Sequence, residues 1–172
     1  VAVNSVAGAG GIKTSLHLGQ GDPISARRAG YVGVAVATAI LFVVTLIVGF
    51  KTRAMGRIFT EDEEFLDAFE GTALPFAAAL FAMNLSVAIE RVPMSMGRTG
   101  EVFWMGFAAS WLGQVPGVLL LTKYWRNDLV GLYTGMALGY VVLSILYAVL
   151  TLTSDWKKCS ELAMMRSEKK KQ

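Results

Sequence analysis

The sequence predicts an all-α membrane protein built as a polytopic bundle of transmembrane helices. Hydrophobic residues make up 54% of the 172 residues and charged residues only 17%, whereas soluble domains carry about 25% charge. The charges gather in clusters separated by long uncharged runs, and roughly 20 apolar residues let a helix cross the hydrocarbon core. Runs such as Val34–Gly49 have no polar face, which argues against a soluble helical bundle.

The uncharged runs predict four complete spans and part of a fifth. The first run begins at Val1, inside an apolar segment, so we expect that an N-terminal part of the protein is missing. The last charged segment is expected to form a cytoplasmic tail. The predicted segments are a partial span at 1–12, complete spans at 29–50, 71–89, 102–122 and 129–154, and a tail at 155–172.

The basic residues predict which side of the membrane each connection faces. Eleven of the 16 Lys and Arg residues flank the same side as the tail, and Lys and Arg are enriched in short cytoplasmic loops. The tail, which ends in Lys169-Lys170-Lys171, is therefore placed in the cytoplasm, and a membrane flank explains it better than nucleic-acid binding. The connection Lys51–Glu70 is expected on the opposite side.

Glycines at four-residue spacing predict close packing of the last span. Gly131, Gly135 and Gly139 form one face of that helix, and helices in lipid associate through such small residues. Contact with another span of this chain is favoured over homodimerisation, because three other spans are present to receive the face.

A few polar or irregular positions inside the spans are candidates for a substrate cavity. Pro116 lies well inside its span, where it should kink the helix, and Gln114 precedes it by two residues. A cavity wall and simple packing both explain this pair. Asn84 and Tyr133 are candidates because polar side chains in spans are few and often functional.

The sequence contains no pattern typical of an enzyme or a metal protein. We find no paired acid and base, no phosphate-binding loop and no metal-ligand spacing. The single cysteine, Cys159, and the single histidine, His17, have no partner cluster. No catalytic residue, metal ligand or resident cofactor is predicted.

Six short motifs, in order along the chain, resemble those of the multidrug and toxic compound extrusion (MATE) family. The first, Ile12–Pro23, is similar to the family's V-R-V-S-N-E-L-G-A-G-N-P loop and includes Gly19 and Gly21, but has Leu16 in place of Asn. The third motif, Pro93–Arg98, contains Gly97 and departs from the family's L-R-G-x-G-R at Met94 and Ser95. The other four motifs are Ile58–Asp62, Gly113–Gly117, Gly131–Gly139 and Ser154–Trp156.

The resemblance implies a twelve-helix transporter made of two six-helix lobes, with this chain running from the end of helix 8 to the C-terminus. It implies efflux of organic cations or other xenobiotics by antiport with Na⁺ or H⁺ as the coupling ion. The expected partners are a small-molecule organic substrate, the lipid bilayer and the missing N-terminal lobe, with no nucleic acid. The plasma membrane and the vacuolar membrane both fit.

Many members of the family carry a carboxylate in the middle of the tenth helix. The matching place here is Met83 or Asn84, neither of which changes charge near neutral pH. We therefore expect that any proton-carrying acid lies in the missing lobe.

Two alternatives differ from drug efflux. A lipid-linked oligosaccharide flippase of the same superfamily would share the lobe architecture but should show cationic residues in its cavity to meet phosphate. A non-transporting membrane scaffold could oligomerise through the glycine face of the last span.

Overall fold

The computed structural model describes residues 2–169 and confirms the all-α fold, with no strand among these residues. Lys170 and Lys171 of the basic tail lie outside the described residues. The helical elements are α1 (Ala2–Gly19), α2 (Pro23–Phe50), α3 (Thr52–Gly56), α4 (Glu63–Gly71), α5 (Ala73–Ser95), α6 (Thr99–Ala108), the π-helical segment η1 (Ala109–Gln114), α7 (Val115–Tyr124), α8 (Leu129–Leu152) and α9 (Trp156–Lys169).

Four helical stretches are long and apolar enough to cross a membrane: Pro23–Phe50, Ala73–Ser95, Thr99–Tyr124 and Leu129–Leu152. Three of them extend beyond the uncharged runs, and Thr99–Tyr124 does so at both ends of the predicted 102–122. Helix α2 begins six residues before the predicted 29, because Asp22 caps it by accepting a hydrogen bond from the Ser25 N–H at 3.0 Å and Pro23 suits the first turn. Helix α5 continues past Glu90 and Arg91 to Ser95, because a charge ends an apolar run without ending a helix.

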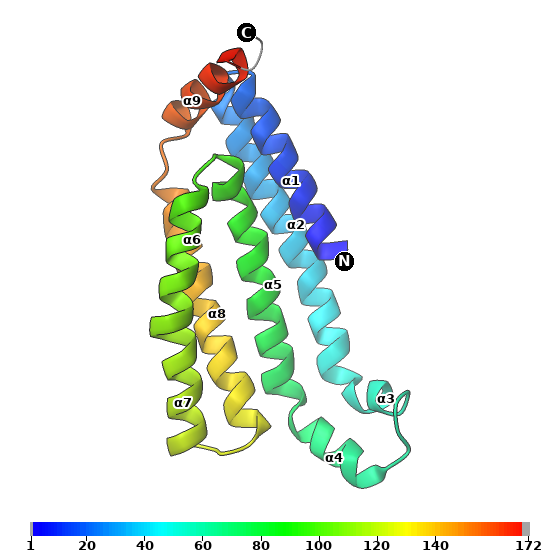
Figure 1. Cartoon of the computed structure of the whole chain (residues 1–172). Coiled ribbons are helices and arrows are strands. Elements are labelled where there is room, and N and C mark those ends of the chain that lie inside the picture. Colours follow the sequence, from blue (N-terminus) through cyan, green and yellow to red (C-terminus); the bar gives the residue numbers. More distant parts are fainter. Residues whose placement is uncertain (1, 170–172) are drawn as a thin grey trace.

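Helix α5 is the central element of the bundle. It packs against α1 and α2 on one side and against α8 on the other, and α6, η1 and α7 cover α8 (Figure 1). Helices α1 and α2 cross at two glycines, since an ideal Cβ on Gly33 would lie only 2.9 Å from the Cα of Gly10. The bare backbones are what allow this close crossing.

The span that contains Pro116 is irregular immediately before the proline. The chain widens into the π-helical segment Ala109–Gln114 and then resumes an α-helix with Pro116 in its first turn. A proline ring inside an α-helix clashes with the carbonyl four residues earlier, and the wider turn relieves that conflict. The irregularity expected at Pro116 is therefore a π turn on its N-terminal side.

The connection between α2 and α5 is folded into two short helices. Asp62 caps α4 by accepting a hydrogen bond from the Glu64 N–H at 3.0 Å. Arg53 of α3 forms ion pairs with Glu63, with Asp67 at 2.7 Å and with Glu70 at 2.9 Å. These contacts hold α4 beside α3.

Helix α9 packs across the two turns at one end of the bundle, so the segment predicted only as a tail is structured (Figure 1). Its Ser160 is buried and donates a hydrogen bond from Oγ to the Leu18 carbonyl at 2.9 Å. The turns before α2 and α6 contain Gly21 and Gly97, with φ of 79° and 81°. Side chains are disfavoured at such angles, and a Cβ at either site would also meet α9, at Met164 or Arg166.

Candidate binding cleft

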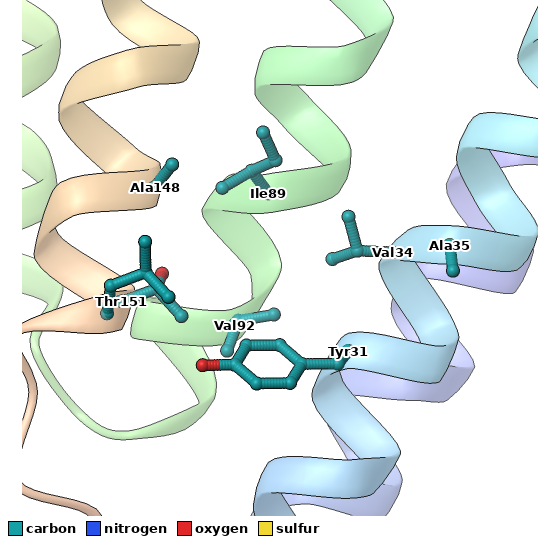
Figure 2. Close-up of a pocket in the computed structure, with 8 residues that line it drawn as sticks. Tyr31, Val34, Ala35, Ile89, Val92, Ala148 and Thr151 are labelled. Atoms are coloured by element: carbon teal, nitrogen blue, oxygen red, sulfur yellow. The ribbon is translucent and has the colours of Figure 1, made fainter.

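Helices α2 and α8 both pack on α5, and two cavities open between them. The first cavity, of about 270 Å³, lies near the α9 end (Figure 2). Its walls are apolar, with Val34 from α2, Ile89 and Val92 from α5 and Ala148 from α8. The second, of about 590 Å³, lies farther along the same helices between Phe42, Phe81 and Val141. We refer to these two cavities together as the α2–α8 cleft.

Each cavity of the cleft has one buried hydroxyl without a hydrogen-bond partner among the described residues. Tyr31 extends from α2 across the first cavity, with its hydroxyl directed toward α5 and α8 (Figure 2). Thr45 Oγ1 is the corresponding group in the second cavity. Thr38, on the same helix, shows the usual arrangement by donating to the Val34 carbonyl at 2.8 Å. A buried polar group left unpaired is costly, and such groups normally meet water or a ligand.

The cleft is suited to bind amphipathic organic molecules. Apolar walls with a few polar groups are the common pattern of small-molecule sites. The one charged group that lines either cavity is Glu70, which is already paired with Arg53. Within residues 2–169 no group of three or more His, Cys, Asp or Glu side chains could hold a metal ion.

The four cavity candidates from the sequence lie elsewhere. The Asn84 side chain donates to the Leu80 carbonyl at 2.9 Å, within its own helix. Tyr133 packs edge-on against Phe76 at 5.2 Å. Gln114 ends the π-helical segment and Pro116 begins α7, both beside α8. None of these residues lines the two cavities of the cleft.

The glycines singled out from the sequence occupy two kinds of position. Gly131, Gly135 and Gly139 are buried, and the last two face the helix before α8: an ideal Cβ would lie 2.6 Å from Val118 Cα and 2.5 Å from Gln114 Cβ, respectively. Gly19, which ends α1, has open space around it. Gly21 and Gly97 are the two turn residues under α9.

Tyr31 and Thr45 were missed by the sequence analysis, although a signal is present. Hydroxyl side chains recur every seven residues along this helix and the next turn, at Tyr31, Thr38, Thr45 and Thr52. Seven residues are almost two helical turns, so the first three lie on one face of α2. A stripe of hydroxyls on an otherwise apolar span indicates the face that meets the cleft.

The pKa shifts outside the spans come from contacts at the α9 end of the bundle. Hydrogen bonds from Ser25 lower the pKa of Asp22 below its ordinary value. Burial raises the pKa of the Cys159 thiol. A hydrogen bond to Glu101 raises the pKa of Arg98, which also donates to the Leu150 carbonyl at 3.3 Å and thereby ties the α5–α6 turn to α8.

Comparison with known proteins gives a consistent set of relatives. The chain is 25% identical over 162 residues to Protein DETOXIFICATION 14 of Arabidopsis thaliana, matching 94% of this chain and 33% of that protein. It is 28% identical over 162 residues to Protein DETOXIFICATION 17 of the same plant, matching 92% of this chain and 33% of that protein. No family model matches.

A solved structure shows the same fold. The crystal structure of a eukaryotic MATE transporter superposes with a TM-score of 0.87 at 24% identity, covering 95% of this chain and 37% of that one. The chain spans about a third of the length of the relatives it matches.

Proposed function

We propose that this chain, a homologue of the DETOXIFICATION proteins with a MATE transporter fold, is part of one lobe of a membrane transporter that exports organic compounds. Organic cations and other xenobiotics are the proposed substrates, and antiport with Na⁺ or H⁺ is the proposed driving reaction. The remaining helices, including a second lobe, would come from the rest of the protein. Alternating access would then arise from one lobe moving against the other.

The observation that carries the proposal is the α2–α8 cleft with its two unpaired hydroxyls. A transporter must bind chemically varied substrates and then release them, which favours apolar walls with few fixed polar groups. Tyr31 and Thr45 provide two separate hydrogen-bonding points along an apolar surface. A compound that uses either point can gain affinity without needing both.

The α9 end of the bundle is proposed to face the cytoplasm. Lys157, Lys158 and Arg166 are exposed on α9, and Arg27 and Arg28 are exposed near the same end. The opposite end carries the acidic α4. This distribution follows the positive-inside rule.

Any coupling acid is proposed to lie in the N-terminal lobe, outside this chain. The position that matches the family's carboxylate is Met83 or Asn84. The Asn84 amide can donate and accept hydrogen bonds, but it neither gains nor loses a proton near neutral pH. Its bond to Leu80 gives it a structural role in this structure.

Export by the full-length protein in proteoliposomes tests the proposal, with the Na⁺ and H⁺ gradients collapsed separately. Thr45→Val removes an unpaired hydroxyl, whereas Thr38→Val on the same face removes one that is satisfied within the helix. We expect Thr45→Val to change KM for some substrates and Thr38→Val to change it for none. Export that survives the loss of both gradients would rule out antiport.

The flippase alternative requires cationic side chains facing the substrate phosphate. No Lys or Arg lines either cavity of the α2–α8 cleft, which favours uncharged or cationic compounds. Movement of a fluorescent lipid-linked oligosaccharide across the same vesicles would reverse this preference. A scaffold function predicts that neither cargo moves.

A further inference from the structure

A second groove, on the other side of α8 from the cleft, contains a carboxylate. It has a volume of about 370 Å³ and lies between α5, α6 and α8, where it continues along η1. Glu90 reaches it from α5, Tyr147 from α8 and Ser110 from η1. Phe103, Phe107 and Trp111 complete its wall. We call it the Glu90 groove.

Glu90 is half-buried in an apolar span and forms no ion pair within residues 2–169. Its neighbour Arg91 is exposed on α5. Glu101 of α6 is already bonded to Arg98, and α8 has no charged residue between Leu129 and Leu152. The carboxylate of Glu90 is therefore the one charged group that lines this groove, and Arg91 acts on it electrostatically without forming an ion pair with it. A charge in a span is costly unless it has a partner or a function.

A glycine on the facing helix leaves room for the Tyr147 hydroxyl at the groove. This hydroxyl lies 3.4 Å from the Val102 carbonyl. An ideal Cβ on Gly106 would lie 2.9 Å from that hydroxyl, so any larger residue at position 106 would displace it. The groove thus has a phenol oxygen fixed beside the carboxylate.

The aromatic wall follows one face of α6 and η1. Phe103, Phe107 and Trp111 are four residues apart, which aligns side chains on a helix. Phe107 and Trp111 have ring centroids 6.1 Å apart, and these three side chains are 63%, 50% and 60% exposed. The π-helical segment Ala109–Gln114 contains Ser110 and Trp111. Such π turns are frequent at functional sites.

The chemistry of the groove selects a monovalent organic cation. A lone carboxylate with two hydroxyls cannot provide the six to eight oxygen ligands of Ca²⁺, and Mg²⁺ requires near-octahedral oxygen coordination. Aromatic faces attract ammonium groups through cation–π interactions, and the volume is that of a small-molecule site. The carboxylate excludes anions.

We infer that the Glu90 groove binds the positively charged group of an organic ammonium compound, with Glu90 as counter-ion and Phe103, Phe107 and Trp111 as the aromatic wall. The inference rests on the proposed export of organic cations and adds a second site to it. The α2–α8 cleft contacts the apolar part of a substrate with its walls and hydrogen-bonds polar groups through two hydroxyls, whereas this groove recognises positive charge.

Binding of tetraethylammonium to the purified full-length protein, measured by calorimetry, tests the inference. We expect Glu90→Gln to raise Kd by about tenfold, since the attraction between a cation and a half-buried carboxylate in contact with it is on the order of the 1.4 kcal/mol of a tenfold change. Glu90→Asp should keep most of the affinity. Phe107→Leu should raise Kd several-fold through the lost cation–π contact. Glu101→Gln, which removes a paired acid outside the groove, is the matched control and should leave Kd within about twofold of the wild type.

A second measurement needs no variant and so does not depend on the folding of Glu90→Gln. Dicyclohexylcarbodiimide modifies carboxyl groups in apolar surroundings, and mass spectrometry locates the product. Tetraethylammonium should protect Glu90 from modification and leave Glu101 unprotected.

Equal Kd for Glu90→Gln and wild type, or unprotected Glu90, would overturn the inference. So would competition by Na⁺ together with normal binding by Phe107→Leu, because that combination describes an inorganic cation site. If gradient-driven export of tetraethylammonium continues in these cases, the proposed function stands and only the groove is wrongly assigned. If the wild type does not bind tetraethylammonium and exports no organic compound under either gradient, both fall.

Discussion

Substitution of Gly135 by alanine should weaken the contact between α7 and α8. A methyl group at this position would lie 2.6 Å from Val118 Cα and 2.9 Å from Val118 N. Ordinary carbon contacts are about 3.5–4.0 Å, so the two helices would have to separate locally by about 1 Å. Both facing atoms belong to the backbone and cannot rotate away.

The magnitude follows from two opposing effects. Overpacking of a well-packed contact costs about 1–3 kcal/mol. Alanine regains up to about 1 kcal/mol over glycine inside a helix. Because the facing atoms belong to the backbone, the upper part of this cost, about 2–3 kcal/mol, applies. The net destabilisation should therefore be about 1–2 kcal/mol, and Gly135→Val should cost more than Gly135→Ala.

Thermal unfolding in detergent, followed by intrinsic fluorescence, measures the effect. For a chain of this size, 1–2 kcal/mol corresponds to a decrease in apparent Tm of about 2–8 °C. Gly100→Ala is the matched control, because a Cβ there meets nothing within 4 Å, and its Tm should not fall. Unchanged Tm in Gly135→Ala, or equal losses in both variants, would refute the steric argument.

Three further predictions concern the two ends of the bundle. Arg53→Gln removes the ion pairs that hold α4, so amide exchange in α4 should speed up more at low salt than at high salt, and a salt-independent change would contradict this. Gly97→Ala forces a side chain into a φ of 81° beneath Arg166. The conformational penalty is about 1–2 kcal/mol and should loosen α9, which increased maleimide labelling of Cys159 would report; labelling equal to that of the wild type would refute the contact. Because burial raises the pKa of Cys159, its thiolate fraction should be below that of an ordinary thiol at neutral pH, and the deficit should vanish as pH rises above both pKa values. Ser167→Cys in a Cys159→Ser background gives the exposed reference on the same helix, and equal labelling rates of the two thiols at pH 7 would argue against burial.

The spans could be predicted from the sequence because apolar length is a local property. Their ends could not, since Arg27, Arg28, Glu90 and Arg91 all lie within helices that the charges seemed to interrupt. A charged side chain near a span end reaches toward water while the backbone stays helical. Pro116 illustrates a similar limit. The sequence locates the irregularity, but a π turn is only one of several backbone geometries that relieve the clash between the proline ring and the preceding turn.

The candidate sites were harder to predict because they depend on which helix faces meet. Gly135 and Gly139 indicate close packing by their type and spacing, whereas their partners on α7 and η1 follow only from the fold. Tyr31 and Thr45 matter because their hydroxyls remain unpaired, and hydrogen bonding within the bundle cannot be inferred from spacing alone. The sequence also contains no sign that α9 returns to α1.

The hydrogen bond between Ser160 and Leu18 joins residues that are 142 positions apart in the chain. During synthesis, at roughly 5–20 residues per second, the end of α1 would wait about 7–30 s before α9 is made. For that interval the turn around Gly21 lacks its cover, and the α1–α2 pair is held by its glycine crossing and by α5 alone. A stop codon or frameshift that removes α9 would thus leave a bundle whose end stays open, because the buried cluster around Leu18 and Val92 would lose Trp156.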